Sequence, residues 1–277
     1  MPGLTLSIHG ARGTAAEDGA GVAQHGGATS CATLTWGDPD AILVLDAGSG
    51  AAAAGPALAG RRRITVLLSH LHLDHLVGLP LLLSAAPQGA ELRVASAAMS
   101  PAALEGALRR LMAPPFYPVA PETLCPGFAV TGMPGRLLDG PTLGAAPLSH
   151  PGGASGYRVA WEGRSLAYLT DHEPDGGVGD AGLRGLAEGA DLALIDATWT
   201  PGEAASRRGW GHGDWRTALD LTQGAGQVGL WHHAPGRSDD ELDAIVEDAR
   251  QVRPGTFAAA AGQVGAVGQV GDFSPGS

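Results

Sequence analysis

Short apolar segments bounded by glycine recur along the first half of the chain. Runs rich in leucine, isoleucine, valine and threonine predict β-strands at residues 4–8, 32–36, 41–45 and 64–69. The spacing of apolar residues then becomes helix-like. We expect a helix at 75–86 whose first turn carries His75, a strand at 91–96 and a helix at 101–112.

The second half repeats this order of strands followed by helices. The pattern predicts a hairpin of residues 156–162 and 165–170, a helix at 183–190, a strand at 191–199, a helix at 215–226, a strand at 227–233 and a helix at 239–252. Two such halves favour two sheets packed face to face with helices outside, a layered α/β sandwich. We expect a single domain over residues 1–277, with a glycine-rich tail at about 266–277 that frays from it.

The composition is that of a globular chain that can bury a core. Hydrophobic residues make up 44% and charged residues 16% of the 277 residues. The net charge of −11 would repel a long polyanion, so long nucleic acids are not expected as partners. A small molecule is the expected partner, and the sequence leaves a homodimer open.

The cysteines and the N-terminus indicate the compartment. Cys31 and Cys125 are too few for a disulfide framework. The N-terminus lacks a basic segment followed by an apolar core, and no apolar run reaches the roughly 18 residues that span a bilayer. These features predict a cytoplasmic protein with no membrane partner.

The densest chemistry of the chain lies in the stretch SHLHLDH. Its side chains His70, His72, Asp74 and His75 all offer lone pairs that a cation such as Zn²⁺ accepts. The stretch follows the predicted strand at 64–69, and a strand end can hold ligands rigidly. Ordinary packing gives no reason to collect three imidazoles there, so the stretch predicts a metal site.

Further ligand candidates follow strand-like or loop segments downstream. They are His150, Asp171 and one of the adjacent pair His232 and His233. Neighbours on a strand point to opposite faces, so the pair is not expected to bind the same ion. Seven ligands suit two divalent ions if one carboxylate bridges them. We expect two such ions, Zn²⁺ first and Mn²⁺ as the alternative.

The order and type of these residues resemble the metallo-β-lactamase superfamily. The resemblance implies a four-layer αββα sandwich in which two mixed sheets pack face to face with helices outside. It also implies one metal ion on His70, His72 and His150, a second on Asp74, His75 and His232, and Asp171 as the bridge. His232 is preferred to His233 because it directly follows its strand, as the family ligand does.

Four further stretches resemble the phosphodiesterase-like branch of that superfamily, which includes ribonuclease Z and cyclic-nucleotide phosphodiesterases. They are GARG at 10–13, GGATSC at 26–31, LVLDAGSG at 43–50 and RRGWGHGDW at 207–215. In this branch a histidine opens a His-Ser-Thr motif and acts near the leaving group, supported by an acidic residue. These roles fall on His212 and Asp196. The chain has Gly213 and Asp214 where the motif has its hydroxyls, so that contribution is absent.

The expected reaction is hydrolysis of a phosphodiester. Two cations roughly 3.5 to 4 Å apart lower the pKa of a shared water to about neutrality and neutralise the phosphate. A departing alkoxide needs a proton, which His212 can give if Asp196 keeps it cationic. Asp74 is expected to be a catalytic residue, together with His212 and Asp196, and also a metal ligand. Asp46, at the end of its strand, is the expected acceptor for an imidazole N–H of a ligand.

The interval between two ligands bears on the substrate. Ribonuclease Z carries a long basic arm between its third histidine and its bridging aspartate, whereas 20 residues separate His150 from Asp171 here. The short interval and the acidic charge favour a small phosphodiester, such as a cyclic nucleotide, over tRNA. The same site would suit a carbonyl hydrolase acting on a lactone or thioester, and a non-catalytic metal-organised binding protein is a further alternative.

Other polar residues carry two interpretations each. Three histidines stand alone in the sequence and are expected to be structural or at the surface: His9, His25 and His172. The proline and aromatic cluster at 114–118 suits either a nucleobase pocket or packing. Arg207 and Arg208 either meet a phosphate or form a solvated pair, and the solvated pair is the preferred interpretation.

Overall fold

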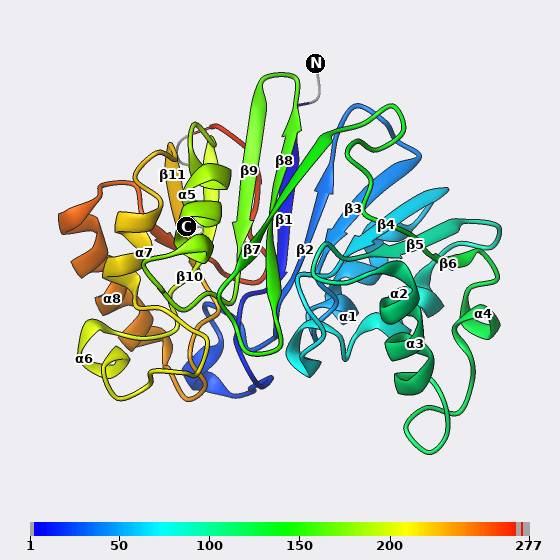
Figure 1. Ribbon diagram of the computed structural model, residues 1–277, viewed down its shortest axis with the longest axis horizontal. Helices are drawn as coiled ribbons and strands as arrows, with labels where there is room; N and C mark the ends of the chain where they lie inside the picture. The colour runs from blue at the N-terminus through cyan, green and yellow to red at the C-terminus, as the bar shows by residue number, and fades with distance from the viewer. Residues whose placement is uncertain (1–2, 270–272, 274–277) are drawn as a thin grey trace.

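The computed structural model describes residues 3–269 and residue 273. Within this part of the chain two β-sheets lie at the centre with helices on their outer sides (Figure 1). The first sheet has the strand order β13 (Val264–Ala266), β1 (Thr5–Gly10), β2 (Cys31–Thr35), β3 (Ala41–Leu45), β4 (Arg63–Leu67), β5 (Glu91–Ala95) and β6 (Phe128–Val130). The second has the order β12 (Phe257–Ala258), β11 (Gln227–Trp231), β10 (Leu192–Asp196), β9 (Arg164–Leu169), β8 (Ala154–Trp161) and β7 (Thr142–Leu148).

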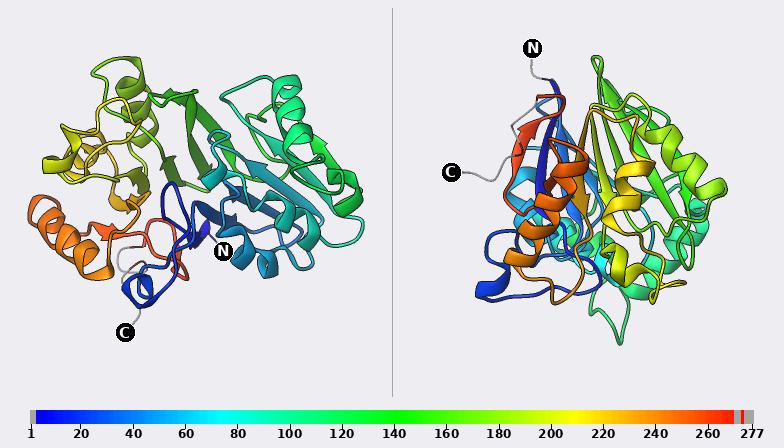
Figure 2. Two further views of the ribbon diagram at one scale, coloured as in Figure 1. Left: turned by 90° about the horizontal axis from the view of Figure 1, so that it is seen from below. Right: turned by 90° about the vertical axis from the view of Figure 1, so that its left-hand side faces the viewer.

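The helices form two groups along the chain. The first group, beside the first sheet, is α1 (Ala51–Ala54), α2 (Leu79–Ala85), α3 (Pro101–Leu111) and α4 (Pro121–Leu124). The second group, beside the second sheet, is α5 (Val178–Ala187), α6 (Pro201–Ala204), α7 (Trp215–Leu221) and α8 (Asp239–Val252). The left-hand view of Figure 2 shows the sheets between the two groups. No helix of the described residues is long and apolar enough to cross a membrane.

Three apolar clusters define the layers of the sandwich. The central cluster contains Leu43 of β3 and Leu194 of β10, one from each sheet. Their neighbours Val44 and Ile195 belong instead to two outer clusters, which join the sheets to α1–α3 and to α5, α7 and α8. Because side chains alternate along a strand, both faces of each sheet are therefore covered. The expected αββα architecture is confirmed.

Strand direction brings the ligand segments to one end of the sandwich. Strands β3, β4 and β5 are parallel, and so are β9, β10 and β11. Strand β7 runs the same way as β9 because each is antiparallel to β8. The carboxyl ends of such strands meet at one edge of a sheet, the usual place for a binding site. Four strands end there close to a candidate site residue, namely His150 after β7, Asp171 after β9, Asp196 at the end of β10 and His232 after β11.

The expected helix at 75–86 is wrong at its start. Residues Leu73–His75 form a short 3-10 turn, and α2 begins at Leu79. The two are separate because the N–H of Gly78 donates to the carbonyl oxygen of Ala47 and the carbonyl oxygen of His75 accepts the N–H of Ala47, each at 2.8 Å, in place of helical bonds. Gly78 also packs tightly against Gly48, where a Cβ would lie 2.1 Å from the carbonyl oxygen. The second half of the SHLHLDH stretch therefore lies on a turn rather than on a helix.

The structure contains an edge strand that the sequence pattern does not predict, and it pairs part of the expected C-terminal tail with the first sheet. Strand β7 has the sequence TLGAAPL, which lacks regular apolar alternation, and its Pro147 is tolerated because β7 is an edge strand. In the expected tail, Ala266 pairs with β1 and the side chains of Val267 and Phe273 are buried. The remainder of that tail, residues 270–272 and 274–277, lies outside the described residues.

Candidate metal centre

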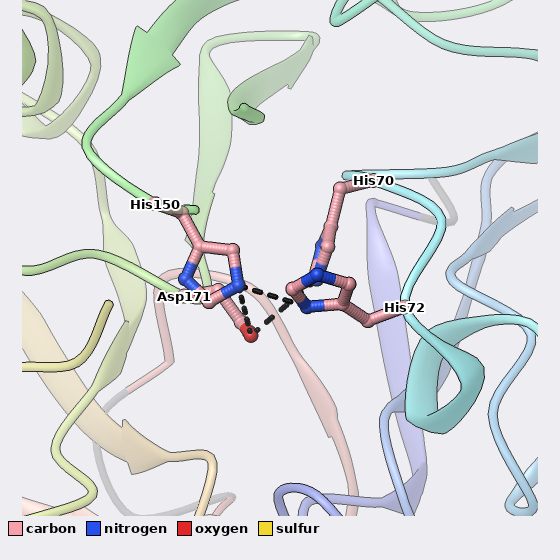
Figure 3. A group of neighbouring side chains, drawn as sticks. All are labelled: His70, His72, His150 and Asp171. Carbon is pink, nitrogen blue, oxygen red and sulfur yellow. Dashed lines mark hydrogen bonds and ion pairs between the residues drawn. The ribbon is translucent and has the colours of Figure 1, made fainter. Parts of the chain in front are cut away.

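The first group of donors joins the two sheets. His70 and His72 come from the loop after β4, and His150 and Asp171 come from the ends of β7 and β9. Their ligand atoms all lie within 4.8 Å of one another. The Nε2 atom of His150 lies 3.0 Å from Nδ1 of His72, and Oδ2 of Asp171 lies 3.6 Å from Nε2 of His70. Figure 3 shows these side chains pointing toward one another from opposite sides.

The second group lies directly beside the first. It consists of Asp74, His75, Asp171 and His232, whose side chains also converge within 4.8 Å. The Oδ2 atom of Asp74 is 3.4 Å from Nε2 of His75 and 3.2 Å from Nε2 of His232. The structure thus brings all seven expected ligands into two adjacent groups.

Asp171 belongs to both groups. Its Oδ1 atom lies 3.1 Å from Nε2 of His75, whereas its Oδ2 atom faces His150 at 3.7 Å and His232 at 3.4 Å. Burial alone would raise the pKa of this carboxyl group, but His232 and His75 hold it well below the usual range. Asp171 is therefore ionised and is placed where a bridging carboxylate would be.

Several site residues have a strained backbone. Asp46, Asp171 and His232 have φ angles of 57°, 55° and 60°, a region that non-glycine residues rarely occupy. Asp46 and His232 directly follow β3 and β11, and Asp171 lies two residues after the end of β9. Strain of this kind persists where the surrounding structure fixes it, and it often marks functional sites.

The chemistry of the donors fits divalent cations. The Nε2 atoms of His70 and His75 are buried and have no hydrogen-bond partner among the described residues. Burial and the neighbouring His75 lower the pKa of His70 to about 2, so its ring is neutral and its lone pair is free. Burial alone would lower the pKa of His75, but Asp171 and Asp46 raise it well above its usual range. The site therefore favours positive charge between these carboxylates, which a metal ion would supply.

Asp46 fixes the orientation of one of these imidazoles. Its Oδ2 atom lies 2.8 Å from Nδ1 of His75, 2.8 Å from the donating hydroxyl of Ser69 and 2.8 Å from the donating hydroxyl of Tyr168. The backbone N–H of Ser69 donates to Oδ1 at 2.7 Å. The expectation that Asp46 accepts an imidazole N–H is confirmed. Such a partner directs Nε2 of His75 toward Asp171.

The imidazoles of the second sheet are held by partners that no sequence motif indicates. Nδ1 of His150 donates to the carbonyl oxygen of Gly211 at 2.9 Å. Nδ1 of His232 lies 3.0 Å from Oγ1 of Thr198, whose hydroxyl donates to Oδ1 of Asp196 at 2.7 Å. These contacts leave the Nε2 atoms of both histidines directed at the donor groups.

The expected pair of His212 and Asp196 is formed beside the second group. Nδ1 of His212 lies 2.7 Å from Oδ2 of Asp196, and the His212 ring stacks on His232 with centroids 4.5 Å apart. Burial disfavours a charge on His212, but the Asp196 carboxylate outweighs it and raises the pKa of His212 to about 9. The structure therefore places a cationic imidazole against the donor groups.

The N-terminal GARG stretch closes another side of the site. The backbone N–H of Thr14, directly after this stretch, donates to Oδ2 of Asp74 at 2.7 Å. A Cβ on Gly13 would lie 2.2 Å from Nδ1 of His232, so only glycine fits there. This stretch therefore positions one carboxylate and one imidazole, a function that its sequence alone does not reveal.

The remaining histidines lie outside the donor groups. His9 contacts Thr33, His25 contacts Asp243 and His172 contacts Asp180, so all three have structural partners. Burial lowers the pKa of His233 to about 3, and its Nε2–H donates to the carbonyl oxygen of Ala259 at 2.8 Å. Of the adjacent pair, only His232 faces the donors.

Two other interpretations from the sequence change with the structure. In the 114–118 cluster, Tyr117 packs against the outer apolar core and Phe116 is 77% exposed, which favours packing for the tyrosine. Arg207 is not a solvated partner of Arg208, because its guanidinium packs against the rings of Trp199 and Trp210.

Comparison with known proteins identifies the family of the chain. The family model of the beta-lactamase superfamily domain matches residues 42–231. The chain belongs to the beta-lactamase superfamily. This superfamily member is 30% identical over 247 residues to ribonuclease Z from Bradyrhizobium sp. (strain ORS 278), a match that covers 72% of the chain and 80% of that relative.

Solved structures confirm the metallo-β-lactamase fold. The superfamily member resembles the metallo-beta-lactamase fold protein YhfI from Bacillus subtilis, with a TM-score of 0.70 and 17% identity over 96% of this chain and 99% of that one. It also resembles a diphosphatase from the PhnP family, with a TM-score of 0.65 and 18% identity over 94% and 96% of the two chains. The short form of human tRNase Z is similar as well, with a TM-score of 0.64 and 18% identity over 95% of this chain and 99% of that one. At identities of 17% and 18%, these similarities show a common fold and nothing about activity.

Proposed function

We propose that the protein is a metal-dependent phosphodiesterase that hydrolyses a small phosphodiester such as a cyclic nucleotide. The observation that carries the proposal is the pair of donor groups that share Asp171, with the His212–Asp196 pair stacked against them. The relative named ribonuclease Z supports hydrolysis of phosphodiesters as the reaction class. Both sheets supply donors, so we propose that the whole chain acts as one domain.

Two divalent cations would occupy the donor groups. His70, His72 and His150 would hold one ion, Asp74, His75 and His232 the other, and Asp171 would join them. Imidazole and carboxylate donors suit Zn²⁺, and Mn²⁺ is the alternative. When bound, such a pair of ions supplies an activated water near neutral pH and neutralises charge on the phosphate.

His212 would give a proton to the leaving group. Its Nδ1–H is directed at Asp196, which leaves the second N–H of the cationic ring to donate to the departing oxygen. Asp196 would keep the ring cationic and hold its orientation. The carboxylate also accepts the Thr198 hydroxyl, so its own position is fixed. A proton on the departing oxygen matters most when an alkoxide leaves.

A small substrate fits the described chain better than tRNA. The 20 residues between His150 and Asp171 are largely taken up by the tight hairpin of β8 and β9, so this interval forms no extended arm. The net charge of −11 also opposes the binding of a long polyanion. We place the enzyme in the cytoplasm, in keeping with its two buried free cysteines.

Turnover by the purified protein tests the proposal. Protein loaded with Zn²⁺ or Mn²⁺ should hydrolyse bis(p-nitrophenyl) phosphate, and elemental analysis should find about two ions per chain. A screen of 2′,3′- and 3′,5′-cyclic nucleotides against a panel of lactones then identifies the substrate class. If the metal-loaded protein opens lactones but leaves every phosphodiester intact, it is a carbonyl hydrolase. If the metal-loaded protein is inactive on both panels, it is a binding protein.

A further inference from the structure

Arg207 is a cation fixed at the side of the site. The central carbon of its guanidinium lies 4.8 Å from the ring centroid of Trp210 and 5.2 Å from that of Trp199. The Trp199 ring in turn makes an edge contact with the His212 ring, with centroids 6.3 Å apart. Cation–π contacts of this kind hold a guanidinium in place without neutralising its charge.

The charge of Arg207 has no acidic partner within the described residues. Two other arginines of the second sheet's helical side are paired, Arg237 with Glu203 at 2.7 Å and Arg184 with Asp220 at 2.8 Å, whereas Arg207 is held between two rings instead. The Nε atom of Arg207 is buried and also lacks a hydrogen-bond partner there. A guanidinium that is held by rings and keeps its N–H groups unpaired is suited to bind a carboxylate or phosphate bidentately.

The loop that carries Trp210 is anchored to the candidate metal centre. The Glu173 carboxylate accepts the backbone N–H groups of Gly209 and Gly211, each at 2.8 Å. The carbonyl oxygen of Gly211 accepts Nδ1–H of His150 at 2.9 Å. A Cβ on Gly211 would lie 2.3 Å from Nδ1 of His150, so the contact requires glycine. The rings that hold Arg207 are therefore fixed relative to a donor of the site.

We propose that Arg207 binds a second anionic group of the substrate. The preferred substrate is then a phosphodiester that carries a further phosphate or carboxylate on its leaving-group side, because the Trp199 ring that Arg207 packs against also contacts the ring of His212, the proposed proton donor. This substrate class rests on the proposed phosphodiesterase function. Trp210 is 55% exposed and positions the arginine. The next residue, Arg208, is exposed and contacts neither ring, so it has no part in the proposal.

A matched set of dinucleotides tests this inference in the metal-loaded enzyme. Thymidylyl-thymidine is compared with the same dinucleotide carrying a terminal phosphate at its 5′ or its 3′ end. One of the two phosphorylated forms should show a kcat/KM about tenfold higher, mainly through a lower KM, because charge-assisted bonds to a fixed guanidinium are strong. Arg207→Gln should remove this gain, and Arg207→Lys should keep part of it. Arg208→Gln is the matched control and should keep all of it.

A purely structural role for Arg207 gives a different result. If the arginine only braced Trp210, Arg207→Gln would slow cleavage of all three dinucleotides alike and leave their ratio unchanged. That outcome overturns the inference while leaving the phosphodiesterase proposal intact. Equal kcat/KM values for all three dinucleotides in the wild-type enzyme overturn it in the same way.

Binding to the metal-free chain separates this inference from the proposed function. Inorganic pyrophosphate, titrated by calorimetry at low salt, should bind the wild-type protein and Arg208→Gln about equally. Arg207→Gln should bind it about tenfold more weakly. This result would support the anion site even in a protein that hydrolyses no phosphodiester. Equal affinities for all three proteins would overturn it.

Discussion

His212 and Asp196 form a closed pair beside the donor groups, with Nδ1 of the imidazole 2.7 Å from Oδ2 of the carboxylate. The carboxylate is buried and also accepts the hydroxyl of Thr198, so it cannot turn away from the ring. The imidazole stacks on His232 but contributes no atom to either of the two groups that contain Asp171. Asp196, His212 and His232 also form a third group of close donor atoms, but Nδ1 of His212 already contacts the Asp196 carboxylate, which favours proton transfer over metal binding for this ring.

His212→Ala should therefore retain metal and lose turnover selectively. We expect kcat on substrates with alkoxide leaving groups to fall by about 10²- to 10⁴-fold, the usual contribution of a positioned acid. The loss on bis(p-nitrophenyl) phosphate should be under about tenfold, because p-nitrophenolate needs little protonation. Elemental analysis and steady-state kinetics on both substrates measure the difference. Equal losses on both would remove His212 from the acid role.

Asp74→Ala should lose metal and activity together. The Asp74 carboxylate lies between His75 and His232, and these histidines hold its pKa well below the usual range despite burial, which opposes ionisation. Without it, one ion loses a charged donor. Asp240→Ala, at an exposed position in the first turn of α8, is the matched control and should keep metal and turnover. Full metal content in Asp74→Ala, measured by elemental analysis, would contradict the assignment.

The candidate ligands could be predicted because their signals are local. His70, His72, Asp74 and His75 lie together directly after an apolar strand, and two halves of strands followed by helices indicate a layered sandwich. The start of α2 could not be predicted in this way. It depends on the packing of Gly78 against a loop that is distant in sequence.

The partners that orient the ligands could not be predicted, because they depend on contacts between distant segments. Tyr168 lies in a strand whose apolar sequence predicts only a place in the core. Its hydroxyl nevertheless donates to Asp46, 122 positions earlier. Thr14 meets Asp74 across 60 positions through a backbone N–H. Thr198 contacts Nδ1 of His232 across 34 positions, and the backbone at His232 takes a φ of 60°. No periodicity in the sequence encodes these contacts.

Asp46→Asn should weaken metal binding more than it changes the fold. The amide keeps the volume of the carboxylate but cannot accept from His75, Ser69 and Tyr168 with the same strength. Loss of such a partner typically lowers metal affinity by about 10- to 100-fold. Competition with a chromogenic chelator measures this change.

Tyr168→Phe removes one of the three contacts with Asp46 and should lower the free energy of unfolding by about 1 kcal/mol, with a smaller loss of metal affinity than Asp46→Asn. An Asp46→Asn affinity equal to that of the wild type would show that Asp46 does not direct His75.

Gly13→Ala should displace a donor without touching any proposed ligand. A Cβ at this position would lie 2.2 Å from Nδ1 and from Cε1 of His232, a distance that real Cβ atoms essentially never show. The ring must move, which disturbs the 3.0 Å contact of its Nδ1 atom with Thr198. We expect about a 10- to 100-fold loss of metal affinity, comparable to the loss of an orienting partner.

The matched control for this substitution is Gly21→Ala, whose Cβ would meet nothing within 4 Å. It should leave affinity unchanged, so the comparison isolates the contact with His232 from the general effect of adding a methyl group. Chelator competition on the two variants, with a thermal melt of each metal-free protein, separates loss of the site from loss of the fold. Unchanged affinity in Gly13→Ala would mean that the His232 ring is free to move and that the N-terminal loop does not position it.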